Sequence, residues 1–180
     1  MIKKVYITSG IGRSGKDSFA QLVGKYIPTY KYSIVDLPKE AAKTLGWNGG
    51  KTDKDRKFLS DIMDLATDYN DSPFRDVVSI VTDFKNNNIE AEVLFIDMRD
   101  PKDIARAVEI FGAETILIKN PRVEQITTNH ADANVEGYNY DYTIVNDGTL
   151  EQLEKVAKFF VCEAIRSKII TPITFVCSRY

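Results

Sequence analysis

Short apolar, β-branched runs alternate along the chain with longer stretches in which apolar residues recur at helical spacing. The runs that we expect to form strands are residues 5–7, 32–35, 93–96, 115–118 and 142–145. Strands that alternate with helices indicate a parallel sheet covered by helices on both faces. The pattern therefore predicts an α/β fold in which ligands bind outside the carboxyl ends of the strands.

Helix start and stop signals divide the segments between these strands. Thr52 is placed to cap one helix, and Ser72 followed by Pro73 starts the next. Asp100 opens a further helix that Gly112 closes. Pro28 and the polar residues 29–31 predict a connection between elements instead. The apolar positions of the helix after Thr52 are Phe58, Ile62, Leu65, Ala66 and Tyr69.

Two segments have no clear period. Residues 119–141 are polar and too long for an ordinary connection, which predicts a functional lid or disorder. Residues 169–180 are apolar and β-prone, and the sequence does not place them in the sheet. Within them, residues 169–176 are expected to form either an edge strand or the contact of a homodimer.

Composition narrows the class of protein. The chain has 180 residues, of which 43% are hydrophobic, and this suits one domain with a sizeable core. The net charge of -2 argues against a protein that binds nucleic acid, because such proteins carry a strongly basic surface. We find no membrane span, no secretory signal, and no metal or disulfide spacing at Cys162 and Cys177, so we expect a cytoplasmic protein.

The glycine-rich stretch 10–16, G-I-G-R-S-G-K, lies between the first strand and the first helix. Gly10, four further residues, Gly15 and Lys16 form the phosphate-binding P-loop arrangement. Glycines let backbone N–H groups turn toward a phosphate, while the helix N-terminus and Lys16 add positive potential. Because strand and helix flank the loop, we favour a nucleoside triphosphate site over a plain turn capped by Asp17.

Two carboxylates are candidate metal ligands. Asp17 stands where Ser or Thr usually binds Mg²⁺, and the hydroxyl follows at Ser18, so either residue is a candidate ligand. Asp97 ends the most apolar strand, as a Walker-B-type acid does, and would hold Mg²⁺ directly or through water. A helix-capping or ion-paired Asp97 is the alternative.

Phosphoryl transfer needs positioning and dispersed positive charge more than a covalent catalyst. The candidate cations are Arg13, Lys16, Arg56, Arg75, Arg99 and Arg122, and a solvated surface position is the alternative for each arginine. The carboxylate of Asp36 is placed to accept a hydrogen bond from a sugar hydroxyl, a base or Lys39. Alternatively, it caps the next helix. Trp47 either stacks on a base or covers the core. His130 has no second histidine or cysteine beside it, which argues against a metal site there.

Taken together, these motifs resemble the phage-type deoxynucleoside monophosphate kinases, a family with the P-loop NMP kinase fold. The matching stretches, which extend to about Leu153, are G-K-D-S at 15–18, residues 36–41, 46–49, 54–56, 95–99 with Pro101, 140–142 and 146–150. The resemblance implies a three-layer α/β/α sandwich with a mostly five-stranded parallel sheet. It also implies one P-loop kinase domain over 1–180, with an NMP-binding helical segment at about 37–88 and a lid at about 119–141.

The same resemblance implies transfer of the γ-phosphoryl group of ATP, with Mg²⁺ bound, to a (deoxy)nucleoside monophosphate. The residues it assigns to ATP are Gly10, Gly12, Arg13, Ser14, Gly15, Lys16, Asp17, Ser18, Asn146, Asp147 and Gly148, the last three near the adenine. On the monophosphate side it implies Asp36, Arg56 and Arg75, to which we add Lys39 and Trp47 as candidate substrate-binding residues. The catalytic set is Lys16, Arg13, Arg99, Asp97 and Arg122, of which Arg122 would close from the lid.

Two other functions compete with this one. A P-loop kinase for another small phosphate-bearing acceptor, such as phosphomevalonate or dephospho-coenzyme A, shares the G-K-D or G-K-S type of loop. The predicted lid has few basic residues, Arg122 being the clearest, which favours a nucleotide-binding protein with little transfer activity.

Overall fold

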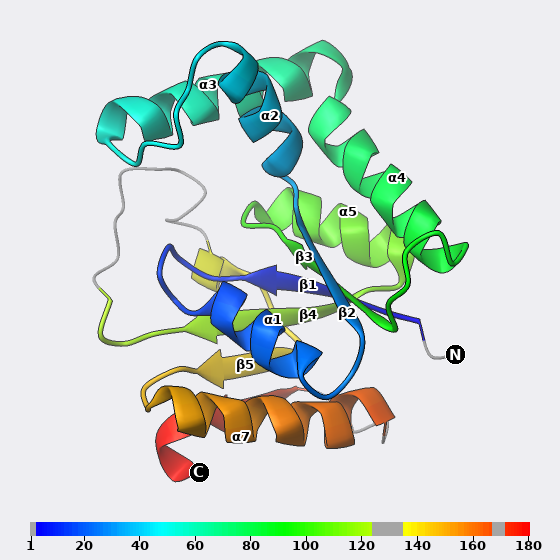
Figure 1. Ribbon diagram of the computed structural model, residues 1–180, viewed down its shortest axis with the longest axis vertical. Coiled ribbons are helices and arrows are strands. Elements are labelled where there is room, and N and C mark those ends of the chain that lie inside the picture. The colour runs from blue at the N-terminus through cyan, green and yellow to red at the C-terminus, as the bar shows by residue number, and fades with distance from the viewer. Residues whose placement is uncertain (1–2, 124–134, 167–171) are drawn as a thin grey trace.

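Six parallel strands form a single sheet in the order β2-β3-β1-β4-β5-β6, as the computed structural model shows (Figure 1). The structure describes residues 3–123, 135–166 and 172–180. The strands are β1 (Lys4–Ser9), β2 (Thr29–Ser33), β3 (Val93–Asp97), β4 (Glu114–Lys119), β5 (Tyr142–Val145) and β6 (Ile173–Val176). Since every neighbouring pair is parallel, the carboxyl ends of all six strands meet at one edge.

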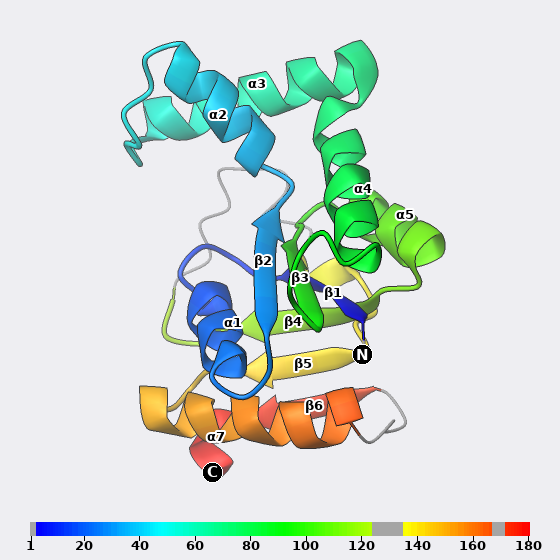
Figure 2. The ribbon, with the colours of Figure 1, turned by 45° about the vertical axis from the view of Figure 1, so that its right-hand side comes forward.

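Helices cover both faces of the sheet, so the expected three-layer sandwich is confirmed. One face carries α1 (Lys16–Gly24) and α7 (Leu150–Phe160), and α7 continues into a π-helical turn, Val161–Arg166. The other face carries α4 (Ser72–Lys85) and α5 (Pro101–Phe111). Figure 2 shows α2 (Asp36–Thr44) and α3 (Asp53–Asn70) beyond the carboxyl end of β2. Short 3₁₀ turns cover Val135–Gly137 and Cys177–Arg179.

An aromatic cluster forms the core between the sheet and the α1–α7 layer. Its fully buried rings are Tyr6, Phe19, Phe95, Tyr142, Phe160 and Phe175. The ring of Phe160 packs edge-on against Tyr6 and Phe19, with centroids 5.2 and 5.5 Å apart. Such pairs add to the free energy gained by burial, so this layer anchors α1 and the loop before it.

The predicted helix signals act as expected. The Thr52 hydroxyl accepts from the backbone N–H of Asp55, whose carboxylate accepts in return from the backbone N–H of Thr52. Asp100 caps α5, and Gly112 ends it with a φ of 64°, in the left-handed region that glycine tolerates. These starts and stops follow from local sequence alone.

The structure corrects two strand predictions. The second strand covers Thr29–Ser33 rather than 32–35, because β2 is an edge strand whose side chains stay partly exposed and polar. The sheet has six strands rather than five, because β6 pairs with β5 through Ile173–Val176. Of the two alternatives for the C-terminal segment, the edge strand is confirmed for these four residues.

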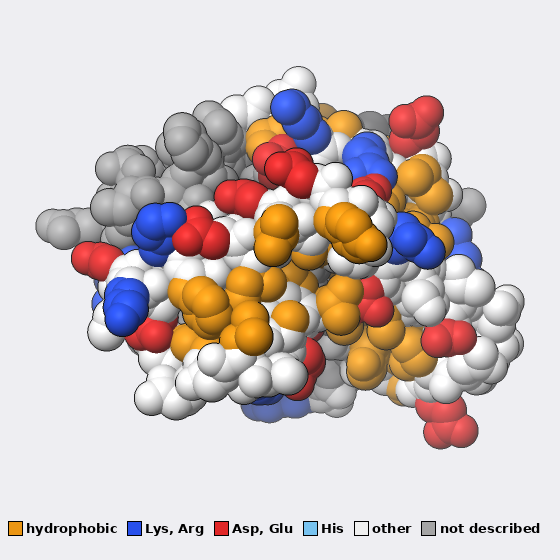
Figure 3. Space-filling model, turned by 90° about the horizontal axis from the view of Figure 1, so that it is seen from above, with side chains coloured by type: hydrophobic (Ala, Val, Ile, Leu, Met, Phe, Trp, Pro, Cys, Tyr) orange, Lys and Arg blue, Asp and Glu red, His pale blue; other side chains and the backbone are white. Residues whose placement is uncertain are grey.

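Helix α3 has no buried residue, although its apolar positions recur at helical spacing. The side chains of Leu65 and Tyr69 are 71% and 84% exposed, and Leu45 after α2 is 70% exposed. Figure 3, which looks down on this end of the molecule, shows hydrophobic side chains at the surface. Among the described residues, no helix combines the length and apolar character that crossing a membrane requires.

We predict that Phe160→Ala lowers the free energy of unfolding by about 3–5 kcal/mol, because it empties the centre of the aromatic cluster. The adjacent Phe159, whose side chain is 40% exposed, offers a matched control. Phe159→Ala removes contacts with the rings of Phe175 and Tyr180 at the surface and should cost only about 1–2 kcal/mol. Urea denaturation of both variants measures the difference in the free energy of unfolding. Equal losses of stability would contradict the placement of Phe160 at the centre of the aromatic cluster.

Candidate active site

The glycine-rich loop 10–15 joins β1 to α1 and packs tightly against the ends of two strands. A Cβ atom on Gly10, whose φ is 143°, would lie 2.3 Å from the carbonyl oxygen of Ile118 in β4. A Cβ atom on Gly15, at a φ of 105°, would lie 2.5 Å from the side-chain amide nitrogen of Asn146. Both positions therefore require glycine, whereas a Cβ on Gly12 would meet nothing within 4 Å.

Asn146, which follows β5, ties the loop to the sheet. Its side-chain amide donates to the carbonyl oxygen of Ser14 at 3.0 Å. Its backbone N–H donates to the carbonyl oxygen of Lys119 at 2.7 Å. The residue predicted to lie near adenine thus contacts the loop backbone directly and holds its conformation.

Lys16 closes the loop on itself. Its Nζ donates to the carbonyl oxygens of Gly10 at 2.7 Å and Ile11 at 3.0 Å. Burial, reinforced by the positive charge of Arg99, lowers the pKa of the Lys16 ammonium to about 8. An anion bound in the loop would oppose both effects, so the lysine environment favours a negatively charged ligand.

Ser14 offers a second sign of an anion site. Its hydroxyl is fully buried and has no hydrogen-bond partner among the residues that the structure describes. A buried polar group without a partner costs free energy, which a ligand that accepts from it can recover. Together with the open space beside Gly12, this fits a phosphate group.

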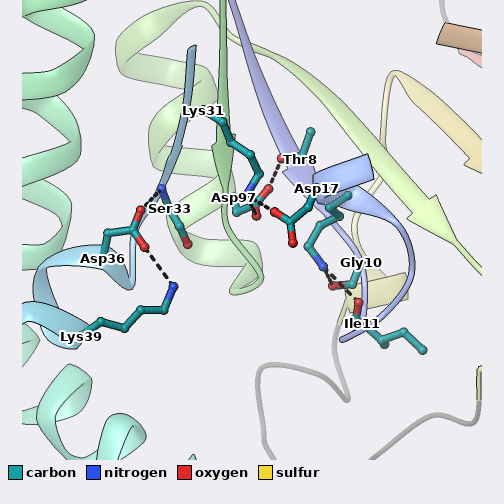
Figure 4. A network of polar contacts seen from close by, with 10 residues as sticks. Thr8, Gly10, Ile11, Asp17, Lys31, Ser33, Asp36, Lys39 and Asp97 are labelled. Atoms are coloured by element: carbon teal, nitrogen blue, oxygen red, sulfur yellow. Dashed lines mark hydrogen bonds and ion pairs between the residues drawn. The ribbon is translucent and has the colours of Figure 1, made fainter. Parts of the chain in front are cut away.

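One ammonium joins the two carboxylates among the candidate metal ligands. The Nζ of Lys31 in β2 lies 2.6 Å from Oδ1 of Asp17 and 2.6 Å from Oδ2 of Asp97 (Figure 4). The other oxygen of Asp97 accepts a short hydrogen bond from the Thr8 hydroxyl. The hydrogen bond from Lys31 lowers the pKa of Asp17. Burial acts to lower the pKa of Lys31, but the charges of Asp97 and Asp17 outweigh it and raise the pKa.

This donor set fits Mg²⁺ better than a closed protein metal site. The described residues contain no group of three or more His, Cys, Asp or Glu side chains arranged to hold a metal ion. Mg²⁺ commonly uses one or two carboxylates and takes its other ligands from phosphates and water. Asp17 and Asp97 supply such a pair, and the half-buried Ser18 follows in α1.

The predicted acceptor residues lie on or beside the helical segment α2–α4. Asp36 accepts from the backbone N–H of Ser33 at 3.0 Å and from Lys39 Nζ at 2.9 Å (Figure 4). The contact with Lys39 agrees with one interpretation of Asp36 from the sequence. Arg56 in α3 and Arg75 at the start of α4 are exposed. Trp47 is half-buried between α2 and α3.

Arg122 lies against the turn that follows β5. Its guanidinium donates to the carbonyl oxygen of Gly148 at 3.3 Å and, through a shorter bond, to that of Asp147. The Asp147 carboxylate accepts from the backbone N–H and hydroxyl of Ser178 at 2.8 and 2.7 Å. Arg122 is therefore placed at the predicted adenine turn. His130 and residues 124–134 of the predicted lid lie outside the described residues.

Sequence reasoning missed Lys31, Thr8 and Ser178. The polar pattern predicts a connection at Lys31, yet T-Y-K-Y-S after Pro28 is rich in residues that favour strands. That signal would have placed Lys31 in the middle of a strand. Thr8 and Ser178 carry no motif, and only the tertiary structure shows their contacts with Asp97 and Asp147.

No protein-family model matches this sequence, and no curated protein does either. Among solved structures, an unliganded sugar kinase from Janibacter sp. HTCC2649 matches with 12% identity and a TM-score of 0.53, covering 94% of this chain and 99% of that chain. Shikimate kinase from Aquifex aeolicus VF5 has 14% identity and a TM-score of 0.44, covering 89% and 97%. Thymidylate kinase from Ehrlichia chaffeensis has 12% identity and a TM-score of 0.37, covering 98% and 93%. The likeness to the first shows that the chain has the P-loop kinase fold.

We predict that Gly10→Ala destabilises the protein by about 2–4 kcal/mol, because it combines an unfavourable φ with a backbone clash at Ile118. Gly12→Ala is the matched control in the same loop, and its effect should stay within about 1 kcal/mol. Thermal and urea unfolding of the two variants test the difference. A Gly10→Ala protein as stable as Gly12→Ala would show that the loop does not pack against β4 as described.

We also predict that binding of inorganic tripolyphosphate weakens as the pH rises above about 8, the lowered pKa of Lys16. The sign follows because an anion favours the charged ammonium, which is present below this pKa and lost above it. Calorimetry at pH 8.5 in two buffers of different ionisation enthalpy should detect proton uptake on binding. Lys16→Met should bind weakly at every pH and take up no proton at this site. Proton uptake that is undiminished in Lys16→Met would assign the effect to another group.

Proposed function

We propose that this protein transfers the γ-phosphoryl group of ATP, bound with Mg²⁺, to a (deoxy)nucleoside monophosphate and forms the diphosphate. The observation that carries the proposal is the convergence of Lys16, Asp17 and Asp97 around a glycine-rich loop at the carboxyl edge of a P-loop kinase sheet. The resemblance of the sequence motifs to phage-type deoxynucleoside monophosphate kinases supports the choice of acceptor.

On the donor side, the loop residues would bind the phosphates of ATP. Backbone N–H groups of the loop and the N-terminus of α1 would face the phosphate oxygens, and the buried Ser14 hydroxyl would gain a partner. Lys16 would exchange its two carbonyl contacts for phosphate oxygens. Arg13 and Arg99 would add dispersed positive charge as the phosphoryl group moves.

Asp17 and Asp97 would hold Mg²⁺, with Ser18 as the alternative ligand to Asp17. When bound, Mg²⁺ neutralises phosphate charge and orients the group that is transferred. Thr8 fixes one oxygen of Asp97, so the other oxygen keeps its direction toward the site. Asn146 maintains the loop geometry from the opposite side.

On the acceptor side, the helical segment 37–88 would bind the monophosphate. Asp36 and Lys39 lie as a contacting pair where β2 leads into α2, near the predicted reaction centre. Exposed Arg56 and Arg75 would supply bidentate contacts to a phosphate, which suits the planar guanidinium group. Trp47 would cover the base.

The proposal also covers the lid, the turn near the adenine, the location in the cell and the binding partners. Arg122 would act from the lid over 119–141, and Asn146, Asp147 and Gly148 would lie near the adenine. A cytoplasmic location, the lack of a nucleic-acid or membrane partner, and a homodimer stay predictions.

The test is ADP formation with Mg-ATP against a panel of deoxynucleoside and nucleoside monophosphates, with phosphomevalonate and dephospho-coenzyme A alongside. We expect turnover with one or a few nucleoside monophosphates, and none with folded Lys16→Ala, which removes the charge next to the transferred group. Turnover only with a non-nucleotide acceptor would keep the kinase chemistry and reject the acceptor. ATP binding without transfer to any acceptor would support the nucleotide-binding protein instead.

A further inference from the structure

Lys31 occupies the point at which the two predicted metal ligands converge. Its ammonium nitrogen lies 2.6 Å from a carboxylate oxygen of Asp17 and 2.6 Å from one of Asp97. We infer that Lys31 is a tethered cation that holds the metal site in the absence of nucleotide and must leave before Mg²⁺ can bind both carboxylates. The inference rests on the proposed use of Mg²⁺ by this site.

The geometry makes the two cations mutually exclusive. Mg²⁺ binds carboxylate oxygens at about 2.0–2.1 Å, only slightly closer than the ammonium does here. An ion that bridges the same two oxygens would therefore stand almost where the Lys31 nitrogen stands. Two positive centres cannot share that space, so metal binding to the pair requires the lysine side chain to move.

A purely structural role explains this contact poorly. The side chain of Asp17 is 80% exposed, and an ion pair to so exposed a partner contributes little to folding stability. Asp97 is different, because its side chain is only 13% exposed and its charge needs a partner. Lys31 supplies that partner when no metal is present. Because its ammonium also contacts Asp17, it holds the two carboxylates close together.

The exchange would couple metal binding to nucleotide binding. A bare divalent ion must displace a lysine that two carboxylates already hold. A nucleotide–metal complex brings phosphate oxygens with it, which offer the released ammonium a new anionic partner. Lys31 would thus suppress metal binding by the protein alone and favour binding of the metal together with the nucleotide.

The experiment measures Mn²⁺ binding to the full chain by electron paramagnetic resonance without nucleotide. Lys31→Met should bind Mn²⁺ at least about tenfold more tightly than the wild type, since a competing charge has left the site. Lys25→Met is the matched control, because it removes the same charge from the Lys25–Glu154 ion pair elsewhere on the surface. That control should bind Mn²⁺ like the wild type. Adding Asp97→Asn to Lys31→Met should abolish the gain.

A second measurement uses the wild type and does not depend on the folding of Lys31→Met. In protein labelled with ¹³C at the lysine ε-carbon, the Lys31 resonance, assigned with Lys31→Arg, should shift on saturation with Mg-ATP. Millimolar Mg²⁺ alone should leave it in place.

Equal Mn²⁺ affinity in Lys31→Met and the wild type would overturn the inference, as would a Lys31 resonance that stays in place in protein that has bound Mg-ATP. The Mn²⁺ comparison requires neither ATP nor an acceptor. Failure of the proposed function in the turnover assay is therefore distinguishable from failure of this inference.

Discussion

The candidate site depends on the close packing of the glycine-rich loop against the carboxyl ends of β4 and β5. Neither Gly10 beside Ile118 nor Gly15 beside Asn146 leaves room for a side chain. That contact exists because the sheet order places β4 and then β5 beside β1, so that the loop leaving β1 crosses the ends of both strands. Sheet topology thus sets the loop conformation, and the loop conformation sets where Lys16 and the N-terminus of α1 point.

Charge balance is the second constraint on this site. Burial and the positive charges of Arg99 and Lys31 lower the pKa of Lys16. Two carboxylates, Asp17 and Asp97, offset part of this positive charge. Burial and the neighbouring cations nevertheless prevail, so the charged ammonium of Lys16 is disfavoured in the free protein. An anion beside Lys16 would offset that cost, so this environment favours an anionic ligand.

Much of the fold was predictable because its signals are local. Strong apolar runs gave four central strands, and capping residues such as Thr52 and Gly112 marked helix ends. The second strand was misplaced because an edge strand needs no apolar pattern, and β6 was left unplaced because its pairing with β5 is a tertiary contact. The P-loop was predictable from spacing. The bridge by Lys31 was not, because it depends on the pairing of β2 with β3, which brings Lys31 to Asp97, 66 residues away.

Helices α2 and α3, which lie beyond the sheet, bury far fewer apolar side chains than the sheet and the helices that cover it. The sheet and its covering helices bury two clusters of apolar side chains, whereas α3 buries none and α2 buries only Pro38 and Ala42. Helix α3 packs only partly buried side chains such as Met63 against one of these clusters. Its capping box and exposed ion pairs such as Lys57–Asp61 contribute little each. Segments with so few buried contacts open at lower free energy than a core. Under the proposed function, α2 and α3 can therefore shift around an acceptor without disturbing the sheet.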